Sequence, residues 1–331
     1  MTSPEPATLS EVSRLAGAVL DEVERAVVGK RDALTLVLSS ILAGGHVLLE
    51  DLPGLGKTLA ARSFAQALGL AFKRAQFTPD LLPADLTGSF IYDQRTSDFV
   101  FRQGPLFTGM LLADEINRTP PKTQSALLEA MQERQVTVEG QTFPLVAPFH
   151  VIATANPIEY EGTYPLPEAQ LDRFLMRVSF GYPTAAQELE VLQRRMARRQ
   201  EEQTLTAVTD TAGVLAMQAA IETVEIDPTV SRYCVALAAA TRSHPHALVG
   251  ASPRGALALM LTSRAYAVLA QRDYVTPEDV KAVAPAVLAH RITVKPELWM
   301  SNASGATVTA AALGSVPTPG AREPLVSAEA R

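Results

Sequence analysis

The sequence predicts an α/β fold in which a parallel sheet carries two inserted β-hairpins, followed by an all-helical domain. Three observations predict it. A short apolar run at 47–49 leads through a glycine-rich turn into a helical pattern at 58–68, the strand–loop–helix order that opens parallel α/β sheets. Apolar runs at 110–113 and 151–154 each end in polar residues, where such sheets bind ligands. From Pro183 onward only helical patterns remain.

The first part of the chain predicts two helices ahead of the first strand. Residues 9–26 carry apolar side chains at helical spacing with charged residues between them, which indicates an amphipathic helix. A second helical pattern at 34–41 stops at Gly44 and Gly45. Further along, residues 175–180 are expected to form the last strand of the sheet.

Two segments alternate apolar and polar residues with the period of a strand. Residues 90–102 have a polar middle between apolar flanks, and residues 135–145 turn at Glu139 and Gly140. Both patterns predict β-hairpins that project from the α/β core.

The second half of the chain predicts a helical domain whose helices begin at capping residues and prolines, such as Asp227-Pro228 and Thr276-Pro277. We place the α/β core at residues 1–182 and the helical domain at 183–300. Residues 301–331 are rich in Ala, Ser, Gly and Pro and are expected to be disordered. The expected helices are 185–199, 206–221, 228–241, 254–271 and 276–289.

Composition narrows the class of protein. With 331 residues, the usual domain size of roughly 150 residues favours two domains. Hydrophobic residues make up 47% and charged residues 19%, which excludes a wholly disordered chain. The net charge of −6 argues against a nucleic-acid partner. The single cysteine, Cys234, cannot close an intrachain disulfide and is expected in a helical core. With no signal peptide and no apolar run long enough to enter a membrane, we expect a cytoplasmic protein.

Residues 51–58 carry the clearest chemical signal. They match the phosphate-binding pattern GxxxxGK[ST] at every fixed position except the first, where an aspartate replaces glycine. Gly54 and Gly56 let backbone N–H groups turn toward phosphates at the start of the following helix. Lys57 is expected to reach the β- and γ-phosphates, and the Thr58 hydroxyl to ligate Mg²⁺.

A pair of acids follows the second predicted strand, about 55 residues further on. Asp114 is expected to hold Mg²⁺, directly or through water, and Glu115 to polarise the attacking water of a hydrolysis reaction.

An amide follows the third predicted strand. Asn156 can orient the water against the γ-phosphate; its alternative role is a turn before Pro157, a common use of Asn-Pro.

Taken together, the motifs resemble those of AAA+ ATPases, with Walker A, Walker B and sensor 1 elements, and more narrowly those of the MoxR family, over residues 10–295. This resemblance implies an AAA+ P-loop core followed by a helical lid. The aspartate at position 51 is the one departure from the pattern and puts the local loop geometry in question; Asp51 tolerates a left-handed backbone better than most residues. The segments that carry the resemblance are 51–58, Gln76–Pro83, Gly104–Phe107, Asp114–Arg118, Ala126–Met131, Asn156 and Leu166–Phe174.

The resemblance also implies roles for two arginines. Arg173 corresponds to the arginine finger that such proteins insert into a neighbouring subunit's site; its alternative is a surface arginine paired with Asp172 or Glu168. Arg254 corresponds to the sensor 2 arginine, which reports nucleotide state to the lid; its alternative is an ordinary residue at a helix start. Nucleotide contacts are implied for Val28, Gly29, Pro53, Gly54, Leu55, Gly56, Lys57, Thr58 and Leu59, and magnesium ligation for Thr58 and Asp114.

In function, the resemblance implies an oligomeric ring, a hexamer, that uses ATP and Mg²⁺ to remodel partner proteins. Such partners include proteins with von Willebrand factor A domains, or proteins that receive a cofactor or metal. No nucleic-acid partner and no membrane insertion are expected. Two alternatives stay open: a DNA-dependent motor, against which the acidic balance argues, and a non-catalytic nucleotide-gated scaffold, against which Glu115, Asn156 and Arg173 argue.

Overall fold

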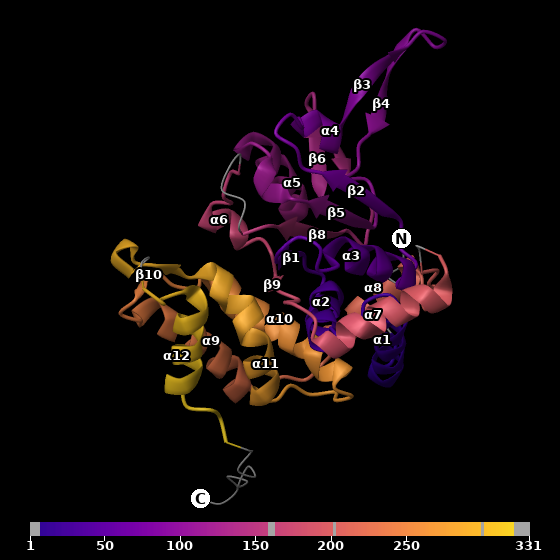
Figure 1. The fold of residues 1–331 in the computed structure, drawn as a ribbon. Coiled ribbons are helices and arrows are strands. Elements are labelled where there is room, and N and C mark those ends of the chain that lie inside the picture. Colours follow the sequence, from indigo (N-terminus) through magenta and orange to yellow (C-terminus); the bar gives the residue numbers. More distant parts are fainter. Residues whose placement is uncertain (1–6, 158–162, 201–202, 299–300, 321–331) are drawn as a thin grey trace, which may run out of the picture.

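The computed structural model describes residues 7–157, 163–200, 203–298 and 301–320. Helices and strands alternate in the first half, and helices dominate the second (Figure 1). In the first half the elements are α1 (Leu9–Glu24), α2 (Arg31–Leu42), β1 (Val47–Glu50), α3 (Lys57–Ala67), β2 (Phe72–Gln76), α4 (Pro83–Thr87), β3 (Gly88–Asp93), β4 (Asp98–Gln103), β5 (Met110–Asp114), η1 (Ile116–Arg118), α5 (Pro121–Glu133), β6 (Gln135–Val138), β7 (Gln141–Pro144), β8 (His150–Ala155), α6 (Glu168–Leu171) and β9 (Met176–Val178). In the second half they are α7 (Ala185–Arg198), α8 (Thr211–Ile221), α9 (Pro228–Ser243), β10 (Ala247–Val249), α10 (Pro253–Leu269), α11 (Pro277–Leu288), η2 (Ala289–Arg291), β11 (Thr293–Val294), η3 (Pro296–Leu298) and α12 (Gly305–Ser315).

The central sheet is parallel, with strand order β2-β5-β8-β1-β9. This confirms the predicted fold class. The chain moves outward from β1 and returns to it, so β1 lies between β8 and β9. The register pairs Ala113 of β5 with Ala153 of β8, which brings the carboxyl ends of these strands to one edge. The residues after both strands therefore meet there.

One strand of this sheet, β2, was not expected from the sequence. Its residues Phe72–Gln76 read Phe-Lys-Arg-Ala-Gln, and only Ala75 is buried. The strand lies at the edge of the sheet, where polar side chains face solvent, so it lacks the apolar run by which central strands are predicted.

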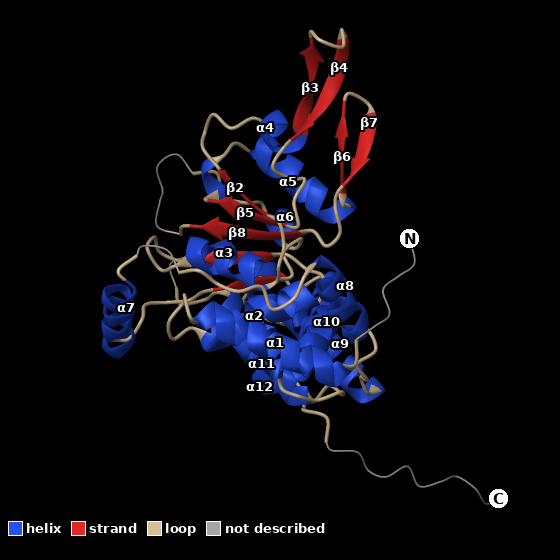
Figure 2. Ribbon diagram, turned by 90° about the vertical axis from the view of Figure 1, so that its right-hand side faces the viewer, coloured by secondary structure: helices blue, strands red, loops and turns tan. Residues whose placement is uncertain are grey.

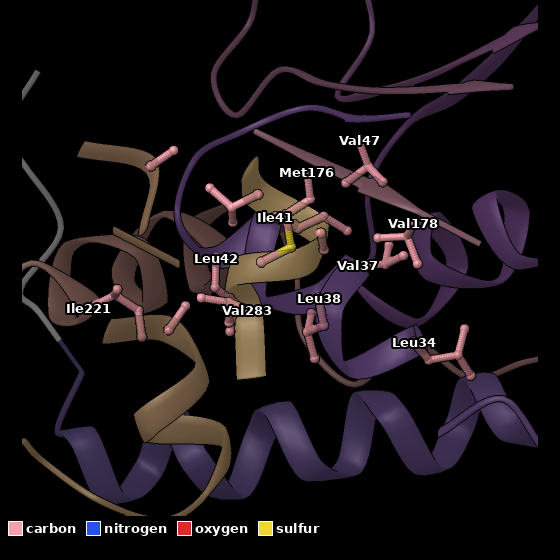
Figure 3. Close-up of a cluster of buried hydrophobic side chains, with 14 of the residues drawn as sticks. Leu34, Val37, Leu38, Ile41, Leu42, Val47, Met176, Val178, Ile221 and Val283 are labelled. Atoms are coloured by element: carbon pink, nitrogen blue, oxygen red, sulfur yellow. The ribbon is translucent and has the colours of Figure 1, made fainter. Parts of the chain in front are cut away.

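Alternate residues of the strands pack on opposite faces of the sheet. Val47 and Leu49 of β1 belong to a large core that also includes the apolar sides of α1 and α2 and of the lid helices (Figure 3). Leu48 belongs to the second core, formed with α5 on the other face. Cys234 is buried in the large core, as predicted, and burial raises the pKa of its thiol to about 12. Core and lid thus share one continuous apolar interior.

Both predicted hairpins are present, as β3–β4 and β6–β7, and both project from the same end of the molecule (Figure 2). They touch at their bases, where the Phe101 and Phe143 rings stack with centroids 4.1 Å apart. Toward the tip of β3–β4, Tyr92 and Phe99 pack edge to face and stay half exposed.

The lid departs from its prediction in detail. It is not wholly helical, because β10 and β11 form a small antiparallel sheet. Helix α8 begins at Thr211 rather than 206, capped by the Asp210 side chain. Among the described residues, no helix is both long enough and apolar enough to cross a membrane.

Disorder from residue 301 is wrong for Gly305–Ser315, which form helix α12. Ser304 caps this helix, and its alanines favour helix formation. Val308 and Ala312 are buried against α9 and α11, so the segment gains apolar burial that its composition did not indicate. Residues 321–331 lie outside the described part of the chain.

Candidate functional site

The phosphate-loop candidate lies between β1 and α3, at the carboxyl edge of the sheet. Gly54 and Gly56 have φ of +81° and +84°, in the left-handed region that favours glycine. A Cβ at either position would meet nothing within 4 Å, so these glycines serve backbone conformation rather than close packing. Gly56 caps α3, whose first N–H groups point into the loop. The exposed Pro53 and Leu59 flank the loop.

The side chains of Lys57 and Thr58 point back toward the strand ends. The Lys57 ammonium donates to the backbone carbonyls of Asp51 and of Ala155, the latter at 3.2 Å. The Thr58 hydroxyl donates to the Asp114 carboxylate at 3.4 Å. These contacts bring the lysine, the hydroxyl and the acid of two distant motifs to one place.

Asp51 does not have the left-handed backbone expected of it, since it is not among the residues with positive φ. Its carboxylate is directed away from the loop. Oδ2 accepts from Phe180 N at 2.5 Å, Gly181 N at 2.9 Å and Ser179 Oγ at 3.0 Å. The side chain thus holds the segment after β9 and keeps its negative charge away from the phosphate side of the loop.

Asp114 ends β5 and is 7% exposed. One carboxylate oxygen accepts from the Thr154 hydroxyl at 2.6 Å. The other accepts from Arg74 of β2, at 3.0 Å from Nε and 2.7 Å from the terminal nitrogen. These partners hold the carboxylate in a fixed orientation, which suits a magnesium ligand.

Glu115 has a φ of +58°, a backbone conformation that is uncommon for residues other than glycine and is concentrated at functional sites. Its N–H donates to the Thr154 hydroxyl oxygen at 2.8 Å. Its carboxylate accepts from Gln76 at 2.8 Å and from Arg118 at 3.0 Å. The side chain is held on the β2 side of the sheet edge.

Three residues that hold these acids were not predicted from the sequence: Arg74, Gln76 and Thr154. Arg74 and Gln76 lie on β2, the strand that was not predicted. Thr154 could have been found, because aligning the two apolar runs at their polar ends sets it beside Asp114.

Asn156 directly follows β8 and is 6% exposed. Its backbone carbonyl accepts from the Asn117 side-chain amide at 3.1 Å, which ties the end of β8 to the helical turn η1 after the acids. The structure therefore brings Asn156 to the same sheet edge as Glu115.

Asp172 precedes the candidate arginine Arg173 in the chain and lies near the other candidate, Arg254. Its carboxylate accepts from Arg291 at 2.8 Å and from the Ser252 hydroxyl at 3.1 Å, and lies 4.0 Å from Arg254. Arg173 has no ion pair among the described residues, so the alternative pairing with Asp172 is absent there. Within the described residues, neither Arg173 nor Arg254 makes a hydrogen bond or ion pair with the phosphate loop.

Val28 and Gly29, expected at the adenine, lie in the turn between α1 and α2. The Gly29 carbonyl accepts from the Gln187 side chain at 3.1 Å, so this turn touches the start of α7.

The site offers oxygen ligands for a magnesium ion through Thr58 and Asp114. Among the described residues there is no group of three or more His, Cys, Asp or Glu side chains that could hold a metal without help. This arrangement fits Mg²⁺, which is usually held by one or two protein oxygens together with substrate phosphates.

Comparison with known proteins decides the family. A sequence profile of the "ATPase family associated with various cellular activities (AAA)" matches residues 46–176, and one of the "AAA lid domain" matches 239–310. Chaperone MoxR1 of Mycobacterium tuberculosis is 44% identical, over 86% of this chain and 77% of its own length. The chain belongs to the MoxR family of AAA ATPases.

Two further proteins resemble this MoxR-family chain over most of its length. The uncharacterized protein YeaC of Bacillus subtilis is 48% identical, over 92% of this chain and 95% of its own. A crystal structure of a Cytophaga hutchinsonii protein described as an ATPase superposes with a TM-score of 0.87, at 41% identity, over 94% of this chain and 97% of that one. The chain is an AAA ATPase by family, and its fold of core and lid is that of its relatives.

Proposed function

We propose that this AAA ATPase hydrolyses ATP with Mg²⁺ at the edge where β1, β5 and β8 end. One observation carries the proposal: two motifs more than fifty residues apart meet there. The Thr58 hydroxyl donates to Asp114, and the Lys57 ammonium donates to the carbonyl at the end of β8. A chance glycine-rich turn would have no reason to meet the acid of a second motif.

The chain's own residues divide the reaction between them. The loop amides and Lys57 hold the phosphates. To do so, the Lys57 ammonium exchanges its hydrogen bonds to the Asp51 and Ala155 carbonyls for bonds to phosphate oxygens. Thr58 and Asp114 hold Mg²⁺, which when bound neutralises phosphate charge. Glu115 exchanges a hydrogen bond from Gln76 or Arg118 for one from the attacking water, and then accepts a proton from that water. Asn156 orients that water. As the water oxygen bonds to the γ-phosphorus, the bond between this phosphorus and the oxygen bridging to the β-phosphate breaks, which gives ADP and inorganic phosphate.

We further propose that neighbouring subunits complete each site in a ring, which we take to be a hexamer. Arg173 supports this, because its guanidinium has no ion pair within the described residues and so is available to a nucleotide of the next subunit. An arginine placed on the γ-phosphate stabilises transition-state charge and raises the rate by about 10³- to 10⁵-fold. Arg254, beside the same Asp172, is proposed to sense nucleotide state.

The cellular role we propose is chaperone-like remodelling of partner proteins in the cytosol. MoxR1, whose name includes "Chaperone", supports this class of role. Proteins with von Willebrand factor A domains, or proteins receiving a metal or cofactor, are the proposed clients. The projecting hairpins with exposed Tyr92 and Phe99 offer apolar contact surface for such a partner.

Turnover measurements with two variants test the catalytic proposal. Lys57→Ala is expected to lose nucleotide binding, and Glu115→Gln to bind ATP with near-normal affinity while turnover falls by at least about 100-fold. Lys281→Ala, which loses only a surface ion pair with Glu278, is the control for removing a lysine.

Other outcomes point to the alternatives. Unchanged ATP affinity in Lys57→Ala refutes the phosphate-loop assignment, and nucleotide binding without any turnover favours a nucleotide-gated scaffold. Stimulation of turnover by DNA at low salt favours a DNA-dependent motor over the chaperone-like role.

A further inference from the structure

The segment between β9 and α7 is held from two sides by loops that belong to the proposed nucleotide site. Gly181, at its centre, donates its N–H to the Asp51 carboxylate at 2.9 Å. Its carbonyl accepts from the Lys30 ammonium, also at 2.9 Å. Asp51 opens the phosphate loop, and Lys30 follows the turn at Val28 and Gly29 that is expected at the adenine. Gly181 is therefore hydrogen-bonded both from the phosphate side of the proposed site, by Asp51, and from its adenine side, by Lys30.

The hold of Asp51 is well formed. The side chain is buried, at 8% exposure, and one carboxylate oxygen accepts the N–H groups of Phe180 and Gly181 and the Ser179 hydroxyl. Gly181 has a φ of +61°, which sets its N–H and carbonyl toward opposite partners and favours glycine there. Hydrogen bonds to an ionised carboxylate are stronger than neutral ones, so this contact resists being broken.

Asp51 also contacts the phosphate-binding lysine. Its backbone carbonyl accepts from Lys57, the side chain expected to move to a phosphate when nucleotide binds. One residue thus joins a contact that nucleotide must change to a carboxylate that fixes the segment 179–181. A glycine, which the phosphate-loop pattern has at this position, would allow the loop to form but could not make the second contact.

Helix α7, which follows this segment, is positioned by polar contacts rather than by packing. None of its residues is buried, and it stands apart from the rest of the lid (Figure 2). Gln187 donates to the Gly29 carbonyl at 3.1 Å, and Arg194 to the Glu24 carbonyl at 2.6 Å. An open cavity of about 310 Å³ lies beside this contact and is lined by charged and polar residues, among them Asp21 of α1 and Arg194 of α7. Few apolar contacts oppose a displacement of this helix.

We propose that Asp51 is a positioning residue that transmits occupancy of the phosphate loop to the segment 179–182 and, through it, to α7. The inference rests on the proposed nucleotide site. When phosphate takes Lys57 from the Asp51 carbonyl, the loop backbone at Asp51 adjusts, and its carboxylate carries Phe180 and Gly181 with it. Lys30 provides the second attachment on the adenine side. The aspartate thus connects the phosphate loop to a helix that is held by polar contacts.

Hydrogen–deuterium exchange with and without saturating MgADP tests this inference on the full chain. In the natural protein, MgADP is expected to change the exchange of peptides spanning 179–198. Asp51→Gly restores the usual phosphate-loop pattern, so it is expected to bind MgADP within about threefold of the natural affinity while that change falls about tenfold. Asp51→Asn keeps an acceptor without the charge, so its MgADP-dependent change in exchange is expected to lie between those of the natural protein and Asp51→Gly. Asp32→Asn, an exposed aspartate on α2, is the matched control.

Steady-state kinetics provide a second readout. If Asp51 positions rather than binds, Asp51→Gly lowers kcat and leaves KM within about threefold. A merely structural role would lower the melting temperature without removing the nucleotide-dependent difference in exchange.

The outcomes separate this inference from the proposed function. Failure of the natural protein to bind MgADP refutes the nucleotide site itself. Binding with no change at 179–198 refutes the coupling alone. Asp51→Gly that keeps the full change, or that loses MgADP binding, also overturns the inference. The first outcome makes the carboxylate dispensable, and the second shows that the carboxylate is needed for nucleotide binding itself.

Discussion

Thr154 shows how one small side chain orders a catalytic edge. Its hydroxyl donates to Asp114 at 2.6 Å and accepts from the Glu115 N–H at 2.8 Å. It therefore fixes the carboxylate expected to bind magnesium and the unusual backbone of the residue expected to polarise water. Threonine suits this position because its β-branched body fits a buried strand while its hydroxyl both donates and accepts.

Replacing Thr154 with Val should keep the shape and remove both hydrogen bonds. We expect stability to fall by about 1–3 kcal/mol, because two buried polar groups lose a partner, and kcat to fall by about tenfold or more. Urea unfolding and ATP turnover measure the two effects. Thr137→Val, on an exposed hairpin position, is the control, and equal turnover in both variants contradicts the role given to Thr154.

The acids and the lysine of the site could be predicted because their spacing follows directly from strand–loop–helix geometry. Arg74 and Gln76 could not, since they act across the sheet from a strand without an apolar pattern. Asp51 was noticed as a departure, but its role depends on the backbone of residues 179–181, which no local pattern relates to it.

Two buried histidines predict a pH dependence of stability. His46 Nδ1 accepts from Val151 N–H while Nε2 faces the Met131 carbonyl. His150 Nδ1 faces the Gly45 carbonyl, and its Nε2 accepts from the Gln218 side-chain amide at 3.0 Å. These contacts require neutral rings. Burial, and the charge of a nearby arginine, lower the pKa of His46 to about 3 and that of His150 to about 4, against 6.5 for an exposed histidine.

The unfolded chain therefore binds more protons than the folded chain between these values. The contribution of these two histidines to the free energy of unfolding is fully present above about pH 6.5. It falls as pH drops toward 4, by up to about 1.4 kcal/mol per pH unit for each histidine. Urea unfolding at pH 7.0 to 5.5 checks this. His150→Gln should lessen the slope, whereas the exposed His246→Gln should not. A slope that is the same in all three proteins would contradict the prediction.

At the scale of elements, patterns of apolar residues predicted the central strands and the hairpins but failed at the periphery. Edge strand β2 is polar, and α12 is rich in small residues that are typical of both disordered and helical segments. Helix α12 forms because α9 and α11 provide a surface for Val308, a tertiary effect that sequence composition does not contain.

The packing of α12 can be measured directly. Val308→Ala should lower the free energy of unfolding by about 2 kcal/mol, the cost of two buried methyl groups with the space they leave. Ala310→Ser, at an exposed position of the same helix, should change it by less than about 0.5 kcal/mol. If Val308→Ala has no effect in chemical denaturation, the helix does not pack on the lid in solution.

At the scale of the whole molecule, the proposed ring requires that sites be shared between subunits. Arg173→Ala should fold and bind nucleotide but hydrolyse poorly, and Lys57→Ala should not bind. In a mixture, sites that combine an intact Lys57 with a neighbour's intact Arg173 recover activity. The measurement is turnover of the mixed sample relative to each variant alone.

A matched control accompanies the mixture. Lys57→Ala mixed with Glu115→Gln should show no recovery, because both defects lie on the loop side of each site and every site keeps one of them. Recovery in neither mixture, with mixed assemblies demonstrated, would place Arg173 outside the neighbouring site.

The large core described above runs without interruption from α1 and the sheet into helices α8 to α11. Sequence motifs divide the chain into two parts, but its interior is continuous. Cutting the chain between them would expose the apolar sides of α1 and α2 to water. The α/β core and the lid should therefore melt together in a single cooperative transition, and substitutions that destabilise the lid should destabilise the sheet as well.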